Sequence, residues 1–354
     1  MPKFKHVILL SDDIRGHYHQ SLGIAEWLER LCGAHIEQIV HVPKLSGLQK
    51  FLTLKLSARK LATNGADYAQ KWLKKFGVAV NGIENDTLFI SAGSSAAPFT
   101  LALAKATGNK SAVVMTPSVL GTKPFDFAII PDHDFHDSSA KNIFTTLGAP
   151  NHIYIPDLPK IGDAFFKGKD FTGEKVLVVL VGGSDANYNM TPEWAEDTFG
   201  PLRYIDGIKI LLSSSRRTGE AVDKKLASIF DGLPTVEYMI LISQKPNYNS
   251  VTALLGKATH VLATDDSVSM VSEAVTAGFK VGLLRVPRFE HKVKEFFGYG
   301  AKRFDEMFDK MLNRKLIEDL GDKPDLMKFL EPPEQKHNID YNEAKRAAEW
   351  IISK

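Results

Sequence analysis

Residues 176–185 read VLVVLVGGSD, an unbroken apolar run that ends in two glycines, a serine and an aspartate. A short apolar run bounded by glycine is typical of a strand that is buried on both faces of a parallel sheet. Similar runs that end in polar turns follow at Ile208–Leu212, His260–Ala263 and Val281–Leu284. Apolar residues at helical spacing over Ser269–Ala277, closed by Gly278, predict a helix between the last two strands.

The first half of the chain repeats this alternation. Apolar runs predict strands at Val7–Leu10, Ile36–Val42, Thr87–Ile90, Ser111–Met115 and Phe127–Ile130, and helical spacing predicts helices at Gln20–Leu31 and Pro98–Thr107. Strands that alternate with helices indicate parallel sheets covered on both faces. Asn151–Lys169, with its prolines and glycines, has the composition of a linker. We therefore predict an α/β fold of two tandem Rossmann-like, doubly wound domains, over residues 1–158 and 159–339.

The composition excludes several function classes. The chain has 354 residues and a formal net charge of +2, so its charge gives no reason to expect a nucleic acid as partner. Cys32 stands alone in the sequence, which excludes an internal disulfide and a cysteine-based metal site. The apolar run near the start is too short for a signal peptide, and no stretch approaches 18 apolar residues. We expect a cytoplasmic protein, with at most a peripheral contact on the inner face of the membrane.

The loop after the first strand, Ser11–His17, is dense in groups that do chemistry. Ligands of open parallel sheets bind beyond the carboxyl ends of the strands, where this loop lies. We predict His17 as general base, because its unperturbed pKa is about 6.5, with Asp12 as the alternative catalytic group. An acceptor is expected to contact Asp13, Arg15, Gly16 and Gln20. The alternative interpretation is a polar loop that only caps a helix.

Two polar turns in the second half suit a diphosphate. Gly182-Gly183-Ser184 lets a phosphate approach the backbone, and Ser213–Thr218 adds hydroxyls and two guanidinium groups. We predict contacts to a nucleotide-sugar donor at Gly183, Ser184, Arg216, Arg217 and Thr218. The alternatives are a plain strand-to-helix turn and a solvated basic turn.

The segment Thr264–Ala274 is the most specific of the four turns. Ser267 and Ser269 lie at a predicted helix start, where backbone amides need oxygen partners. Glu273 follows in the same helix, where a carboxylate can accept hydrogen bonds from ribose hydroxyls. We predict donor binding by Asp266, Ser267, Ser269 and Glu273; the alternative for Glu273 is an exposed helix glutamate.

Asp132-His133-Asp134 matches the Asp-x-Asp pattern of metal-dependent glycosyltransferases. A metal site needs further carboxylates or phosphates at this point, which the sequence does not place. We therefore predict no metal and no cofactor, and assign Asp132 and His133 to the acceptor side of a cleft.

The stretch 44–76 interleaves lysines with apolar residues such as Phe51, Leu61 and Trp72. One interpretation is a surface that meets anionic lipid headgroups. The other is a set of ordinary domain helices with solvated lysines.

These motifs together resemble a known family. Ser11-Asp12, Gly16-His17, Gln20–Gly23, Pro131–Asp134, Gly182–Ser184, Ser215–Thr218 and Asp266–Ala274 are similar to the plant mitochondrial-fission "elongated mitochondria" proteins and their bacterial relatives. The resemblance extends from about residue 6 to about residue 290. It implies a layout of the GT-B glycosyltransferase type, in which a C-terminal helix, here 340–354, joins the first domain and the two domains face a cleft.

The closest analogy within that layout is the peptidoglycan enzyme that adds N-acetylglucosamine to a lipid-linked acceptor. It implies roles for Gly16-His17 near the reaction centre and for Glu273 at the ribose of the donor. We expect a metal-independent glycosyltransferase that moves a sugar from a nucleotide-diphosphate sugar, its co-substrate, to an acceptor hydroxyl that is lipid-linked or part of a cell-envelope glycan. The alternatives are a sugar-nucleotide epimerase on the same fold and a non-catalytic, membrane-associated adaptor.

Overall fold

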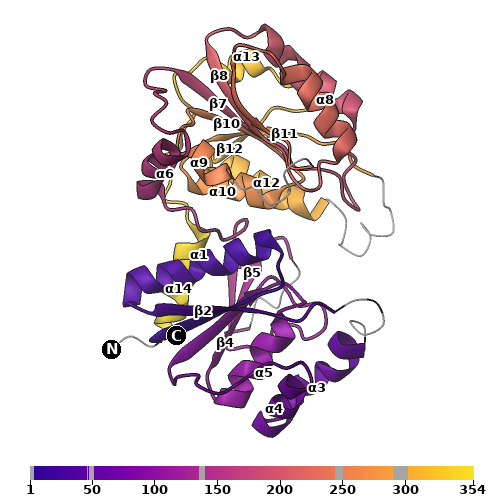
Figure 1. Cartoon of the computed structure of the whole chain (residues 1–354), viewed down its shortest axis with the longest axis vertical. Helices are drawn as coiled ribbons and strands as arrows, with labels where there is room; N and C mark the ends of the chain where they lie inside the picture. Colours follow the sequence, from indigo (N-terminus) through magenta and orange to yellow (C-terminus); the bar gives the residue numbers. More distant parts are fainter. Residues whose placement is uncertain (1–3, 46, 48–51, 135–139, 244–249, 290–301) are drawn as a thin grey trace. The chain divides into compact units, whose positions relative to one another are not determined.

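The chain forms two units, each built on its own six-stranded sheet (Figure 1). The computed structural model describes residues 4–45, 47, 52–134, 140–243, 250–289 and 302–354. Unit 1 comprises Met1–His152 and Asn342–Lys354, and unit 2 comprises Ile153–Tyr341. Unit 2 thus begins before residue 158, where the sequence analysis ended the first domain, because the helix that follows packs within unit 2.

Unit 1 contains six strands and the helices that cover them. Its elements are β1 (His6–Ser11), α1 (Arg15–Cys32), β2 (His35–His41), the π-helix η1 (Leu52–Ser57), α3 (Arg59–Thr63), α4 (Ala66–Lys74), β3 (Thr87–Ala92), α5 (Ala97–Thr107), β4 (Lys110–Val114), β5 (Phe127–Pro131), β6 (Ile143–Thr146) and α14 (Glu343–Ser353).

The strands of unit 1 run parallel in the order β2-β1-β3-β4-β5-β6. Alternate residues of each strand point to opposite faces. Val7 and Leu9 of β1 pack with α1 and α14, whereas Ile8 and Leu10 pack with α3, α4 and α5. The order reverses between β1 and β3, and open sheets bind their ligands at such a reversal.

Helix α14 belongs to unit 1 although unit 2 separates it from the rest of that unit in sequence. Figure 1 shows it in yellow beside α1. Ala347, Ala348 and Ile351 are fully buried there. Glu343, 2% exposed, accepts a hydrogen bond from the amide of Leu147 at 3.2 Å. The core on this face of the sheet is therefore incomplete without α14.

Unit 2 has the same alternation of strands and helices. Its elements are η2 (Ile155–Asp157), α6 (Leu158–Phe165), β7 (Lys175–Leu180), α7 (Pro192–Phe199), η3 (Gly200–Tyr204), β8 (Ile208–Ser213), α8 (Glu220–Phe230), β9 (Val236–Ile240), α9 (Val251–Leu255), β10 (His260–Thr264), α10 (Val268–Thr276), β11 (Val281–Leu284), α12 (Lys302–Asn313), β12 (Ile317–Asp319) and α13 (Leu326–Leu330).

The strands of unit 2 also run parallel, in the order β12-β11-β10-β7-β8-β9. Leu177 and Val179 of β7 lie in a core shared with α7, α8 and α13. On the other side, α9 and α10 contact β7, β10 and β11. The order reverses between β7 and β10, so the turns after these two strands form the expected ligand end. The predicted α/β fold with two Rossmann-like sheets is thus confirmed.

Three details differ from the sequence analysis. Helix α1 begins at Arg15, not Gln20, because Ile14 already has the extended backbone of a helix N-cap. The predicted linker contains α6, whose Leu158 and Gly162 are buried. Strands β6, β9 and β12 were not predicted, because all three are short and two of them are only half-buried over most of their length.

In the described part of the stretch 44–76, the apolar residues mostly serve the core of unit 1. Leu61, Trp72 and Leu73 are buried, whereas the lysines on α3 and α4 are exposed. Leu52 and Leu56 of η1 remain 45% and 57% exposed. Among the described residues, no helix is both long and apolar enough to cross a membrane.

His260 is a buried histidine at the start of β10. It has no exposed surface, its Nε2 lies 3.1 Å from the carbonyl oxygen of Pro332, and its Nδ1 lies 2.9 Å from Thr259 Oγ1. Since a carbonyl only accepts, Nε2 carries the hydrogen and the neutral ring is satisfied on both sides. Burial lowers the pKa of His260 to about 4.

This lowered pKa predicts a loss of stability in acid. In the unfolded chain His260 takes up its proton as the pH falls below about 6.5, whereas in the folded chain it does so only near pH 4. The stability contributed by the neutral His260 is therefore fully present above pH 6.5 and is lost as the pH falls towards 4. We expect a loss of about 3 kcal/mol in the free energy of unfolding between pH 7 and about 4, measured by denaturant unfolding. His260→Gln should remove most of it, and His35→Gln, at an exposed histidine, should not. Equal pH dependence in both variants would contradict the assignment.

Candidate functional site

The connection between β1 and α1 is a short, fixed turn. Only Asp12, Asp13 and Ile14 lie between the two elements. The amide of Asp13 donates to Ser11 Oγ at 3.1 Å, and the amide of Ile14 donates to Asp12 Oδ1 at 3.2 Å. Asp13 has a φ of 63°, the left-handed region that aspartate tolerates better than most residues. These bonds fix the polar side chains at the carboxyl end of β1.

Asp12 and His17 form a side-chain pair across this turn. Asp12 Oδ2 lies 2.9 Å from His17 Nδ1, with 5% of the aspartate and 23% of the histidine side chain exposed. An ionised carboxylate only accepts, so Nδ1 carries the hydrogen in the neutral ring and Nε2 keeps its lone pair. In the described part of the chain Nε2 has no hydrogen-bond partner. The arrangement leaves one ring nitrogen able to accept a proton.

Gly93, just after β3, makes room for the imidazole. A Cβ at this position would come within 2.6 Å of His17 Nδ1, and the φ of Gly93 is 82°. Only glycine combines that backbone with so close an approach. The turns after β1 and β3 therefore hold the ring from two sides.

A second cluster of charges lies beside the pair. Asp13 bonds to His41 Nδ1 at 2.6 Å and to Lys44 at 3.0 Å. Hydrogen bonds from Lys44 and then His41 lower the pKa of Asp13. A cavity of about 290 Å³ adjoins them, lined by Asp12, Ile14, Val42, Pro43, Lys44, Leu45 and Ser95. Its walls come from the turns after β1, β2 and β3, the point where the strand order reverses.

Of the other residues predicted to contact an acceptor, two lie beside the pair. Arg15 and Gly16 open the first turn of α1. Gln20 is only 7% exposed, and its amide contacts Met115 Sδ at 3.9 Å, so it lies inside the unit.

Asp132 and His133 follow β5. The amide of Asp132 donates to the carbonyl oxygen of Thr146 at 2.8 Å, which ties the turn to β6. Strands β3 and β4 lie between β5 and β1 in the sheet. The structure therefore does not bring Asp132 and His133 next to the Asp12–His17 pair.

In unit 2 the two glycines after β7 make room for protein. A Cβ on Gly182 would lie 2.2 Å from Asp266 Oδ2, and one on Gly183 would lie 2.0 Å from the carbonyl carbon of Arg217. The sequence analysis interpreted these glycines as room for a phosphate. The space is instead filled by the turns after β8 and β10.

Asp266 joins these turns. Its carboxylate has no exposed surface and accepts from the amide of Gly183 at 2.7 Å and from the Arg217 guanidinium at 2.8 Å. Burial raises the pKa of Asp266, while Arg217 opposes this shift. Asp266 and Arg217, both predicted to bind a donor, are thus engaged with the protein.

The hydroxyls of the β8 turn are engaged in the same way. Ser215 Oγ donates to the carbonyl oxygen of Gly182 at 2.7 Å, and Thr218 Oγ1 donates to the same oxygen. Ser184 Oγ accepts from the amide of Met190 at 2.9 Å. Arg216, by contrast, is exposed. Arg217 is exposed as well but is paired with Asp266, so we assign Arg216 to a ligand.

The first turn of α10 is the open part of the site. Ser267 is the N-cap residue, yet its side chain makes no capping hydrogen bond. Ser267 and Ser269 are half-buried. Such a turn attracts anions because its amides and the helix dipole both favour negative charge. Glu273 lies on the next turn and is 8% exposed.

The sequence analysis missed an ion network after β11. Asp265, with no exposed side-chain surface, lies 3.3 Å from Arg285 and 3.1 Å from Arg288, and Arg288 also pairs with Asp305. The Arg288 guanidinium stacks over the buried ring of Tyr188, 5.4 Å from its centroid. Burial raises the pKa of both Asp265 and Tyr188. The sequence contained a pattern that could have predicted this network. Arg285 and Arg288 follow an apolar strand, as Arg216 and Arg217 do.

The sequence profile described as mitochondrial fission ELM1 matches residues 15–354. The chain belongs to the mitochondrial fission ELM1 family. The resemblance recognised from the motifs is therefore confirmed, and the family match also covers the part beyond residue 290. No curated protein sequence matches this family member.

Solved structures similar to this family member share its two-domain GT-B fold. The UDP-GlcNAc 2-epimerase from Methanocaldococcus jannaschii covers 98% of both chains at 15% identity, with a TM-score of 0.52. MnaA of S. aureus, solved with UDP, and the glycotransferase of kitacinnamycin each match at 12% identity with a TM-score of 0.50, over 99% of this chain and 95% of theirs. At such identities the likeness establishes the fold, and the activity must be argued from the residues.

The close approach at Gly183 gives a direct test of the unit 2 site. In Gly183→Ala the new Cβ must displace the Arg217 backbone, so we expect a loss of about 2–3 kcal/mol in the free energy of unfolding, measured by urea denaturation. Gly65→Ala is the matched control, because a Cβ there meets nothing within 4 Å and should cost less than about 1 kcal/mol. Equal losses in the two variants would show that the turns are not interlocked.

Proposed function

We propose that this chain transfers a sugar from a nucleotide-diphosphate sugar to an acceptor hydroxyl. The observation that carries the proposal is the Asp12–His17 pair at the carboxyl end of β1, with Nε2 left as acceptor. Transfer to a hydroxyl requires a base that removes its proton, and a histidine held by a carboxylate is suited to that task.

In this proposal the two members of the pair have separate roles. His17 Nε2 takes the proton of the acceptor hydroxyl as the oxygen attacks the anomeric carbon of the sugar. Asp12 holds the ring in the tautomer that leaves Nε2 unprotonated, and it stabilises the imidazolium that forms. The adjoining cavity of about 290 Å³ is where we place part of the acceptor.

We assign the donor to unit 2. The first turn of α10, with Ser267 and Ser269, supplies amides for the diphosphate. Arg216 supplies a guanidinium, and such donors stabilise the negative charge that builds on the leaving group. Glu273 is assigned to the ribose hydroxyls. These groups would neutralise the diphosphate without a metal ion.

We propose that the acceptor is lipid-linked, on the basis of residues outside the two sites. Exposed lysines on α3 and α4, with the exposed Leu52 and Leu56 of η1, support a peripheral contact with an anionic membrane. An acceptor linked to a lipid would be presented at such a surface. Leu48, Lys50 and Phe51 of the predicted membrane segment lie outside the described residues.

The pair predicts a separation of binding from transfer. In His17→Ala the base is lost, so we expect transfer of the sugar to fall by about 10²–10⁴ while nucleotide affinity stays within about twofold. Asp12→Asn, which keeps the shape but not the charge, should lower transfer as well. Transfer is measured with radiolabelled nucleotide sugars and membrane or glycan extracts as acceptors, with His35→Ala as control. Unchanged transfer in His17→Ala would remove the base from the proposal.

Glu273 is tested by nucleotide binding alone. We expect Glu273→Ala to weaken binding of UDP or of the best-bound nucleotide by about tenfold or more, because the hydrogen bonds that the ribose donates to a carboxylate are lost. Affinity is measured by isothermal titration after a thermal-shift panel of UDP-, GDP-, CMP- and dTDP-sugars. Glu220→Ala, at an exposed glutamate of α8, is the control. Turnover of the donor without any acceptor would instead identify an epimerase.

A further inference from the structure

Unit 1 contains a second cavity, beside the one where we place part of the acceptor. It has a volume of about 340 Å³ and lies between the edge strand β2 and the loop that joins α4 to β3. Most of its lining residues are apolar, and the exceptions are His41, Gly77 and Asn81. Such a lining is typical of a site for a hydrophobic ligand. We refer to it as the apolar cavity.

The apolar cavity has a buried inner wall and a half-buried outer wall. Ile8 of β1, Phe89 of β3 and Leu103 of α5 form the inner wall and are at most 1% exposed. The polar lining residues His41 and Asn81 are exposed. A ligand would thus meet hydrocarbon inside the cavity and polar groups towards the solvent. The outer wall consists of half-buried residues that pack against the same core, namely Val40, Phe76, Val78 and Ile83.

The loop that forms the outer wall is held at both ends. At its start, the amide of Val78 donates to the carbonyl oxygen of Leu73 in α4 at 3.2 Å. Near its end, the carbonyl oxygen of Glu84 accepts from Thr87 Oγ1 at 2.7 Å and from Asn109 Nδ2 at 3.0 Å. Because these bonds lie within the protein, the cavity does not need a ligand to form, which reduces the entropy that binding must overcome.

The apolar cavity shares a wall with the cavity of about 290 Å³ where we place part of the acceptor. Val40 and His41, at the end of β2, line the apolar cavity. Val42 and Lys44 line the other one. Pro43, between them in sequence, lines both. The two cavities are therefore neighbours on either side of one segment of chain, and a single molecule can occupy both.

We propose that the apolar cavity binds the hydrocarbon chain of the acceptor, next to the head group that carries the reacting hydroxyl. This inference rests on the proposed function, in which the acceptor is lipid-linked. The volume of the cavity falls in the range of small-molecule sites. Each methylene group that is buried strengthens binding about fourfold. A chain held in this way keeps the head group in the cavity beside the Asp12–His17 pair.

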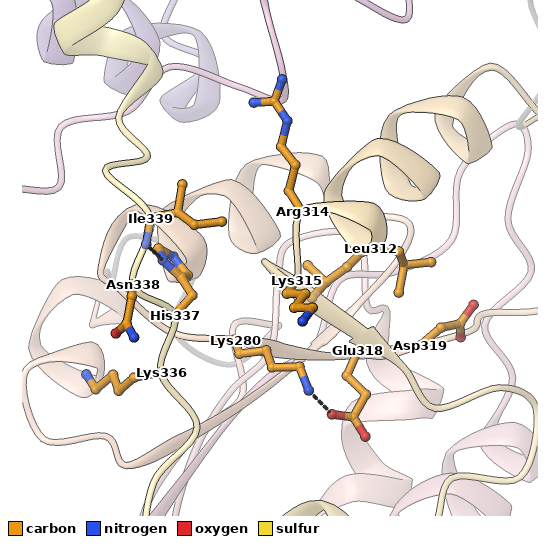
Figure 2. A pocket seen from close by; sticks show the side chains of 11 residues that line it. Lys280, Leu312, Arg314, Lys315, Glu318, Asp319, Lys336, His337, Asn338 and Ile339 are labelled. Carbon is orange, nitrogen blue, oxygen red and sulfur yellow. Dashed lines mark hydrogen bonds and ion pairs between the residues drawn. The ribbon is translucent and has the colours of Figure 1, made fainter.

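A larger cavity, at the edge of the sheet in unit 2, is less suited to such a chain. It has a volume of about 800 Å³ (Figure 2). Its lining includes charged groups of both signs, and Figure 2 shows the ion pair of Lys280 and Glu318 among them. A hydrocarbon chain there would remove water from these charges, which costs free energy. This cavity therefore serves as a control for the test.

The test compares decyl glucoside, kept below its micelle concentration, with methyl glucoside, which lacks the chain, by isothermal titration of the full protein. We expect decyl glucoside to bind about tenfold or more tightly. Val78→Trp fills the cavity and should remove most of this difference. The matched control is Val80→Trp, because Val80 is a half-buried residue of the same loop that packs on the same core outside the cavity lining. It should bind decyl glucoside as the unaltered chain does.

A second variant covers the case in which Val78→Trp does not fold. Val78→Asn keeps about the same size but places an amide against the chain, so we expect decyl glucoside to bind about threefold or more weakly. Ile339→Trp narrows the larger cavity of unit 2 and should have no effect. Equal affinity in the Val78 and Val80 variants, or a loss confined to Ile339→Trp, would overturn the proposal.

The titration contains no nucleotide sugar, so its result does not depend on sugar transfer. An absence of transfer with intact chain binding would contradict the proposed function and leave the apolar cavity as a chain site. If Val78→Trp weakened binding to phosphatidylcholine vesicles but not to decyl glucoside, the ligand would be a membrane phospholipid, and the assignment to the acceptor would be wrong.

Discussion

A buried carboxylate, Asp266, fixes the carboxyl end of the sheet in unit 2. It binds the amide of Gly183 and the guanidinium of Arg217, so the turns after β7, β8 and β10 form one bonded assembly. A buried charge that loses its partner is costly, typically by several kcal/mol, so these turns are expected to move together. Any ligand of the first turn of α10 therefore meets groups whose positions are set beforehand, which reduces the entropy that binding must overcome.

The fold was largely predictable because most strands are continuous apolar runs. Val176–Val181 and His260–Ala263 can be recognised as strands without knowing which strands they pair with. Burial on both faces makes each of them a continuous apolar run. The strands that were missed, such as Ile317–Asp319 at the edge of its sheet, bury too few residues to leave a pattern. The start of α1 was placed too late because polar residues opening a helix look like a loop until Ile14 is seen to act as its N-cap.

The turns of the candidate site could be located from the sequence, whereas the contacts of their side chains could not. The rule that ligands bind at the carboxyl ends of strands selected the turns that hold Asp12 and Asp266. The same rule does not predict that the carboxylate of Asp12 bonds to His17. Nor does it predict that the carboxylate of Asp266 bonds to a backbone amide and to Arg217. That distinction depends on side-chain contacts that span 5 residues between Asp12 and His17 and 49 residues between Arg217 and Asp266. Gly93 illustrates the same limit, because its need for glycine arises from its φ of 82° and from the approach of His17, which is distant in sequence.

The placement of α14 has a consequence for biosynthesis. Its alanines complete the core of unit 1, yet the ribosome makes residues 343–353 only after all of unit 2. During synthesis, the apolar face of α1 that packs against α14 stays uncovered until the end of the chain is made. Unit 2 has all of its strands before that point. Unit 2 is therefore expected to fold first, and a frameshift or nonsense mutation late in the gene would leave unit 1 exposed to aggregation and to proteolytic quality control.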